Sequence, residues 1–238
     1  MKMKLFAAGL LLAASSVQAT IATVFEGIPT GAAKFDSTVI AAGGTVMTDV
    51  WTSMLSGAVV DRGDYSITRT NGGSLSFGSY GSMSGRILGI DPAGASRDAL
   101  ATKASGITLT FDNPINSFGF EVGDWATCCH NPTTDLFISF DNGAPILVAT
   151  AKTEADGLFK NQAGRLVNEI FVAAFDDSSS FSKVQFWGNG LGEYLVAGGQ
   201  VKYALLKQNS LPPSVPAPAT AALLGLGLFA LRLRKTAK

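Results

Sequence analysis

The sequence predicts an all-β protein, an antiparallel β-sandwich with jelly-roll-like connections. Short runs of β-branched and aromatic residues recur along the chain, and several of them alternate polar with apolar positions. Clusters of Gly, Asn, Asp and Pro separate these runs, and no long helical periodicity interrupts them. Residues 20–210 are long enough for one domain of two packed sheets with a substantial core.

The first half of this body contains predicted strands at residues 23–25, 64–69, 74–77, 107–111 and 115–122. A turn at Gly27-Ile28-Pro29 follows the first strand, and Asn71-Gly72-Gly73 predicts a hairpin between the second and the third. The fourth strand reads Ile-Thr-Leu-Thr-Phe, so its three apolar side chains share one face. Asp112-Asn113-Pro114 predicts a turn after it.

The second half contains predicted strands at residues 135–140, 146–151, 169–175, 183–187, 194–196 and 200–206. Asp141-Asn142-Gly143 predicts a hairpin between the first two. An Asp-Asp-Ser-Ser-Ser turn at 176–180 joins the third to the fourth. Residues 96–102 are the only predicted helical turn in the middle of the chain.

The N-terminus has the three parts of an export signal. Lys2 and Lys4 form a basic start, residues 5–14 form an apolar segment, and Val17-Gln18-Ala19 ends in a small residue suited to cleavage. We therefore expect a signal peptide at residues 1–19, with cleavage between Ala19 and Thr20.

The C-terminus, residues 211–238, has the composition of a membrane anchor. Prolines precede an uncharged run at residues 217–231, and basic residues follow it. A bilayer core needs about 20 helical residues, and Leu233 with the long stems of the flanking arginines extends this shorter run. The basic end is expected to stay in the cytoplasm, which places the body outside the inner membrane. A buried C-terminal helix is the alternative, but the prolines would detach such a helix from the core.

This tail resembles the PEP-CTERM sorting signal of exopolysaccharide-producing Gram-negative bacteria. The residues that carry the resemblance are Val215, Pro216, Ala217, Pro218, Arg232, Arg234 and Lys235. The family most often has Glu where this chain has Ala217. The resemblance implies a single transmembrane helix and processing by an exosortase-type membrane enzyme.

The body is similar to the jelly-roll ectodomains that often precede such tails. The similar segments are residues 25–29, 109–114, 118–124 and 138–143, followed by Gly192-Glu193-Tyr194. Ala197-Gly198-Gly199 stands where those ectodomains have an acidic residue or Asn. This resemblance implies a fold and a location, and no substrate.

Charge and cysteine content exclude some functions. Of the 18 basic residues, two lie in 1–19 and four in 211–238, which leaves 12 against 18 acidic residues, a net charge of −6 for the body. A nucleic-acid surface needs a basic footprint, so no nucleic-acid partner is expected. The two cysteines, Cys128 and Cys129, are adjacent and can form a vicinal disulfide or remain thiols. They do not supply a zinc framework, and we favour a structural turn.

One loop holds the candidate ligand-binding residues Asp124, Trp125, His130 and Asn131. Carbohydrate-binding sandwiches stack an aromatic ring on a sugar and bond its hydroxyls with Asp and Asn. A tryptophan in such a loop can instead cover the end of the core, which is the commoner case. Asp176, Asp177 and Glu193 are candidate calcium ligands, or else parts of solvated turns.

No catalytic template fits, because His130 is the only histidine and no nucleophile elbow is present. We therefore expect an exported protein, anchored in the inner membrane and then located at the cell surface or in the extracellular matrix. Its role is expected to be structural or glycan-binding, with extracellular polysaccharide as a partner. The alternatives are a secreted glycan-active hydrolase and an adhesion protein without a small ligand.

Overall fold

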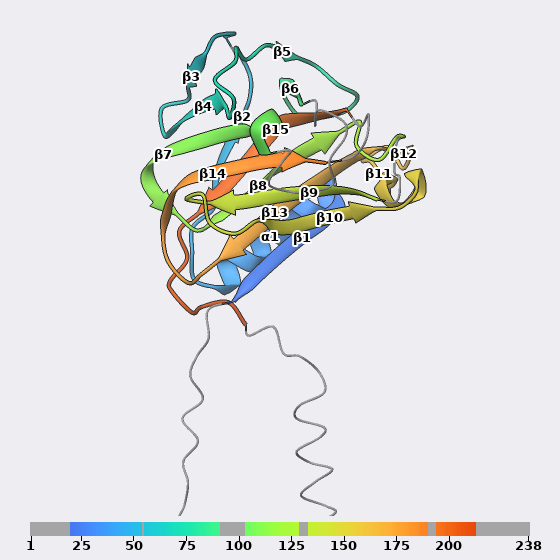
Figure 1. Cartoon of the computed structure of the whole chain (residues 1–238). Coiled ribbons are helices and arrows are strands. Elements are labelled where there is room, and N and C mark those ends of the chain that lie inside the picture. The colour runs from blue at the N-terminus through green and yellow to red at the C-terminus, as the bar shows by residue number, and fades with distance from the viewer. Residues whose placement is uncertain (1–19, 54, 91–102, 129–132, 190–193, 213–238) are drawn as a thin grey trace, which may run out of the picture.

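Two antiparallel β-sheets pack face to face in the computed structural model of the chain (Figure 1). The structure describes residues 20–53, 55–90, 103–128, 133–189 and 194–212. Every strand pair among them is antiparallel. The prediction of an all-β sandwich is confirmed for this part of the chain.

The seven-stranded sheet has the order β1-β13-β8-β15-β6-β5, and β2 also pairs with β15. Its strands are β1 (Ile21–Gly27), β2 (Met47–Val50), β5 (Phe77–Gly78), β6 (Ile87–Ile90), β8 (Ser117–Gly123), β13 (Glu169–Asp176) and β15 (Leu195–Ala204). A bulge between Gly198 and Val201 shifts the register of β15 against β8. Because of this bulge one continuous strand replaces the two predicted at 194–196 and 200–206.

The six-stranded sheet has the order β10-β9-β14-β7-β4-β3. Its strands are β3 (Val59–Asp61), β4 (Tyr65–Arg69), β7 (Ile107–Ile115), β9 (Thr134–Phe140), β10 (Ile146–Ala151) and β14 (Phe181–Gly188). The predicted hairpin at 135–151 is confirmed as β9 and β10. The smaller elements are two short 3₁₀ turns, η1 (Lys103–Ser105) and η2 (Glu154–Gly157), and a small hairpin of β11 (Phe159–Lys160) and β12 (Leu166–Val167).

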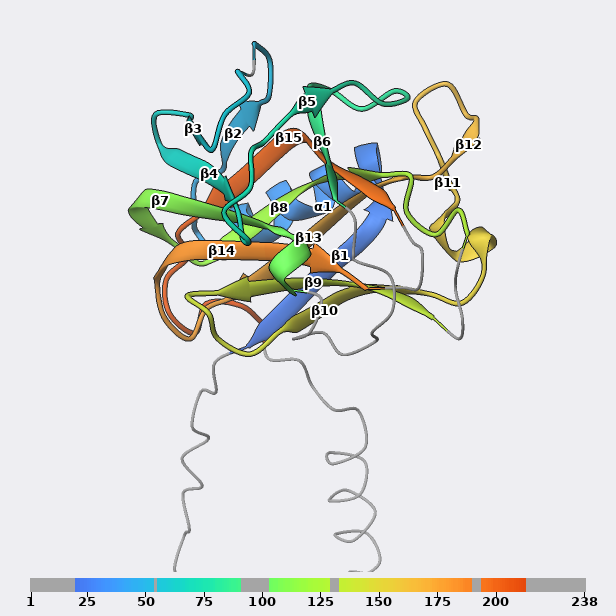
Figure 2. The ribbon, with the colours of Figure 1, turned by 45° about the horizontal axis from the view of Figure 1, so that its top comes forward.

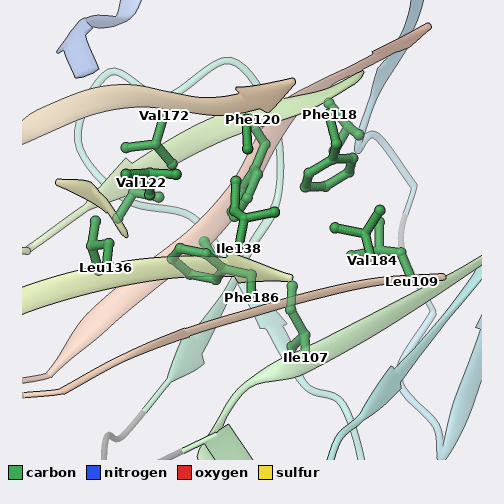
Figure 3. Packing of buried hydrophobic residues seen from close by; sticks show 14 of the residues in the cluster. Ile107, Leu109, Phe118, Phe120, Val122, Leu136, Ile138, Val172, Val184 and Phe186 are labelled. Carbon is green, nitrogen blue, oxygen red and sulfur yellow. The ribbon is translucent and has the colours of Figure 1, made fainter. Parts of the chain in front are cut away.

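The core lies between the two sheets and is lined by alternate residues of each strand. Figure 3 shows Phe118, Phe120 and Val122 of β8 facing side chains of β7, β9 and β14 across the interface. Ile107 and Leu109 of β7 lie on the core side, and Phe111 belongs to the same cluster. The prediction that these three residues of β7 share one face is confirmed.

One helix, which was not predicted from the sequence, covers the outer face of the seven-stranded sheet. Helix α1 (Ile28–Ala41) buries Gly31, Phe35 and Val39, which are spaced four residues apart along one face. Figure 2 shows α1 on the side of this sheet that faces away from the six-stranded sheet. The predicted turn at Gly27-Ile28-Pro29 is the start of this helix, since proline is accepted in a first helical turn.

Two further local predictions are wrong. Residues 64–69 and 74–77 do not form a hairpin, because β4 pairs with β3 and β7 while β5 pairs with β6 in the other sheet. Asp112-Asn113-Pro114 is not a turn, because β7 continues through it to Ile115. The predicted helical turn at 96–102 lies outside the described residues.

No helix in the described part of the chain is long and apolar enough to cross a membrane. The predicted signal peptide at 1–19 lies outside the described residues, and so does all of the predicted C-terminal segment 211–238 beyond residue 212.

Candidate functional site

Trp125, the aromatic residue among the predicted ligand-binding residues, is part of the core. Trp125 is only 1% exposed, and its ring meets Phe25 edge-on with centroids 5.5 Å apart. A ring enclosed in this way offers no free face to a sugar, and its packing is that of a residue that covers the end of the core. Asp124, which precedes it, accepts a hydrogen bond from the Tyr80 hydroxyl at 3.2 Å. His130 and Asn131 lie outside the described residues.

The other predicted site residues are only partly described. Cys128 is disulfide-bonded, and Cys129, the only other cysteine in the sequence, lies outside the described residues. Glu193 of the predicted calcium set also lies outside them. Asp176 accepts a hydrogen bond from the backbone N–H of Ser178, and Asp177 is fully buried. The described residues contain no group of three or more His, Cys, Asp and Glu side chains that could hold a metal ion.

The outer face of the seven-stranded sheet carries two buried glutamates that sequence reasoning missed. Glu121 of β8 is 0% exposed and Glu169 of β13 is 5% exposed. Ser84 donates its backbone N–H, at 2.7 Å, and its hydroxyl to Glu121, and Ser82 donates the same two groups to Glu169. We call Glu121 and Glu169 the enclosed carboxylate pair. The two carboxylates fix the loop between β5 and β6 onto the sheet.

Burial raises the pKa of Glu121, and the nearby charge of Glu169 adds to this effect, while hydrogen bonds from Ser84 and the Gln200 backbone oppose it. A pocket of about 240 Å³ lies beside Glu169 and is also lined by Ile28, Pro29 and Asn161. Two carboxylates of this kind are the groups that glycoside hydrolysis uses. Here Glu121 is closed off from solvent and saturated with donors, which is the arrangement of a structural anchor.

A larger hollow of about 740 Å³ lies where the loop after β4 meets β6 and the start of β15. Its lining residues come from four separate parts of the chain: Arg69, Asn71, Gly73, Ser74, Ser76, Gly89, Ala104, Ser105 and Tyr194. We call this hollow the Arg69–Tyr194 groove. In Figure 1, β4 and β6 lie at the end of the molecule opposite the described chain ends. The volume of the Arg69–Tyr194 groove falls within the range of about 300–1,000 Å³ typical of ligand pockets.

Tyr194 provides an accessible aromatic surface in this groove. Its side chain is 48% exposed. The hydroxyl end of the ring lies against Gly89, and a Cβ built on Gly89 would overlap it. Glycine at this position of β6 therefore allows the ring to lie close to the strand.

Arg69 provides a cation beside this ring. It is half-buried, and among the described residues no carboxylate forms an ion pair with it. Burial lowers the pKa of Arg69, and the neighbouring Tyr194 opposes this shift. Arg62, by contrast, donates two hydrogen bonds to Asp49 at 2.9 and 2.6 Å. The Arg69 guanidinium, with five N–H donors, thus faces an open groove lined by hydroxyl and amide groups.

The sequence contained one signal for this site. Arg69 follows Tyr65 and Ile67 at alternate positions of β4, and both of these are buried. A charged residue at the apolar positions of an alternating strand indicates either a partner or a site. No local signal connects it to Tyr194, because the position of the two residues in one groove depends on how the two sheets pack.

No protein-family model matches the chain, and no curated protein matches it.

Proposed function

We propose that the protein is exported from a Gram-negative cell and acts as a glycan-binding β-sandwich at the cell surface or in the extracellular matrix. In this proposal the Arg69–Tyr194 groove holds the glycan, and a PEP-CTERM-like tail with one transmembrane helix anchors the protein in the inner membrane until an exosortase-type enzyme processes it. The jelly-roll-like character of the ectodomain is part of the same proposal.

The observation that carries the binding role is a half-exposed tyrosine beside an arginine with no carboxylate partner among the described residues. An aromatic ring offers an apolar face to the C–H groups of a sugar, while the guanidinium, amide and hydroxyl groups bind its oxygens. The groove is open and has a volume of about 740 Å³, which suits a polymer passing through it.

Export is supported by the residues at the two ends of the chain. A basic start, an apolar segment and a small-residue cleavage site precede Thr20. Prolines, an uncharged run and basic residues occupy the last part of the chain. The net charge of −6 in the body disfavours nucleic acid as a ligand.

The test is a glycan array and a polysaccharide pull-down with residues 20–238 in detergent micelles, run with and without calcium. Selective retention that falls at least about tenfold in Tyr194→Ala and in Arg69→Gln is expected, since hot-spot residues contribute about 1.4 kcal/mol or more. Matched controls remove similar exposed groups away from the groove: Leu166→Ala and Arg165→Gln. Retention that is unchanged by both groove variants would contradict the assignment of the site.

The adhesion alternative predicts no retention on any glycan together with binding to cells or proteins. The hydrolase alternative predicts release of reducing ends that disappears in Glu169→Gln. It has less support, because the enclosed carboxylate pair is engaged by serine donors.

A further inference from the structure

Asp177 joins the two ends of the described domain. Its side chain is fully buried, one carboxylate oxygen accepts the backbone N–H of Thr20 at 2.8 Å, and the other accepts the backbone N–H of Leu211 at 2.7 Å. Its backbone carbonyl accepts the N–H of Asn209 at 3.1 Å. The start of β1 and the last described residues accordingly lie together at the bottom of Figure 1.

The Asp177 carboxylate is closed off from solvent, and no side-chain cation of the described residues forms an ion pair with it. Thr20 is 6% exposed and Leu211 is 4% exposed. The described ion pairs involve other residues: Lys34 with Glu26, Arg62 with Asp49, and Lys202 with Asp36. The backbone N–H groups stabilise the buried carboxylate, and a positive charge at hydrogen-bond distance would stabilise it further.

We propose that Asp177 is a built site for the α-ammonium group of Thr20, which exists only after the chain is cleaved between Ala19 and Thr20. This inference rests on the export part of the proposed function. In the cleavage a signal peptidase uses one water molecule to hydrolyse the Ala19–Thr20 peptide bond. Ala19 keeps the new carboxylate, and the Thr20 nitrogen leaves as an amine and takes up a proton.

Cleavage changes the interaction at Asp177 from a neutral hydrogen bond to a buried ion pair. In the uncleaved chain the Thr20 nitrogen is an amide with a single hydrogen, and in the cleaved chain it is an ammonium at neutral pH. Hydrogen bonds between charged groups are shorter and about twice as strong as neutral ones. Since Thr20 is buried in the folded domain, the protease acts before the chain folds, and folding then encloses the new terminus.

Only cleavage between Ala19 and Thr20 places the new ammonium group at Asp177. Cleavage one residue earlier would leave Thr20 as an amide and move the ammonium away by about 3.8 Å, the spacing of consecutive Cα atoms. The second oxygen of Asp177 holds Leu211, which lies where the domain leads into the C-terminal segment. One carboxylate therefore stabilises both points where the targeting segments join the domain.

The test compares two full-length chains in detergent micelles that differ by one residue, residues 20–238 and residues 19–238. Each is released from an N-terminal fusion by a protease that leaves no extra residue. The chain that starts at Ala19 is expected to have an unfolding equilibrium constant at least about tenfold larger, because it loses the ion pair and keeps the neutral hydrogen bond. In Asp177→Asn the two starts should differ by less than about twofold. Equal stability of the two starts with Asp177 present would overturn the proposal.

A second measurement needs no variant of Asp177. An amine-acylating reagent should label the N-terminus of residues 20–238 at least about tenfold more slowly than that of residues 19–238, because the bound ammonium reacts only through local opening. Equal labelling rates would also overturn the site.

N-terminal sequencing of the chain exported from a Gram-negative host separates this inference from the proposed function. If Thr20 is the first residue, the result supports both export and the binding of the Thr20 ammonium by Asp177. An exported chain that starts at another residue overturns the role of Asp177 as an ammonium site, while export stands. Loss of glycan binding overturns only the groove.

Discussion

The enclosed carboxylate pair and the Arg69–Tyr194 groove both involve the seven-stranded sheet, but their polar groups are in opposite states. In the enclosed pair, each carboxylate accepts a backbone N–H and a hydroxyl from one serine. Trp125, in the core between the sheets, is buried as well. In the groove, the aromatic ring is half exposed, and the described residues offer its arginine neighbour no carboxylate.

This difference separates groups that hold the fold from groups that are available to a ligand. A buried polar group saturated by the protein has no bonding capacity left for a substrate, and its removal leaves donors without partners. A partly exposed cation in a hollow keeps its donors for whatever enters. Variants in the enclosed region should therefore change stability, and variants in the groove should change binding.

The largest expected effect is that of Trp125→Ala. Removing a fully buried tryptophan leaves a cavity, so the free energy of unfolding should fall by about 3–5 kcal/mol. Urea denaturation measures this loss, with the exposed Leu147→Ala as a control that should change stability by less than about 0.5 kcal/mol. If Trp125→Ala has a normal free energy of unfolding but no longer retains glycan, then Trp125 belongs to the binding site and not to the groups that hold the fold.

Glu121→Ala should produce the next largest loss, about 3 kcal/mol. It leaves the backbone N–H and hydroxyl of Ser84 without their acceptor in a buried place, and each such group costs about 1–3 kcal/mol. The exposed Glu154→Ala is the control, with little expected change. Glycan retention by the fraction that remains folded should be normal. If retention is lost with little change in stability, the pair belongs to a binding or catalytic site.

The pH dependence of stability sharpens the comparison further. Burial raises the pKa of Glu121 above its usual value of 4.5, so the folded state binds this proton more tightly than the unfolded state. The favourable contribution of this group is complete below pH 4.5 and is lost as the pH rises through the folded-state pKa. Relative to Glu121→Gln, the wild-type protein should therefore lose stability as the pH rises from about 4 to about 8. Denaturation curves of both proteins across this range measure the difference, and parallel pH profiles would contradict a raised pKa.

The sequence predicted the sheets where alternation and turn chemistry agreed. β7 and β9 were found because their apolar residues alternate, and β10 because a strong hairpin turn follows Phe140. Helix α1 was missed because it contains Gly31 and several β-branched residues, which are poor helix formers. Packing of Phe35 and Val39 against the sheet stabilises it, and local propensity does not show such tertiary support.

The candidate site was harder to predict than the fold. The loop around Trp125 drew attention because it combines residue types used for sugars, but burial decides whether an aromatic ring binds a ligand or fills the core. The groove combines residues from four parts of the chain, and only sheet packing brings Arg69 to Tyr194. A single sequence shows the arginine at an apolar position of its strand, but not the tyrosine that lies beside it.

Gly89→Ala should have the smallest effect on stability and a large effect on the groove. A methyl group at this position would overlap the hydroxyl end of Tyr194, whose half-exposed ring can turn away into solvent. Stability should change by less than about 1 kcal/mol, while glycan retention should fall at least about tenfold because the aromatic face is displaced. Gly78→Ala in the neighbouring strand is the matched control, since its added Cβ would make an ordinary contact of 3.6 Å with Ile87. Equal retention by the two alanine variants would show that the position of Tyr194 does not matter for binding, and the distinction between the two regions would then rest on Arg69 alone.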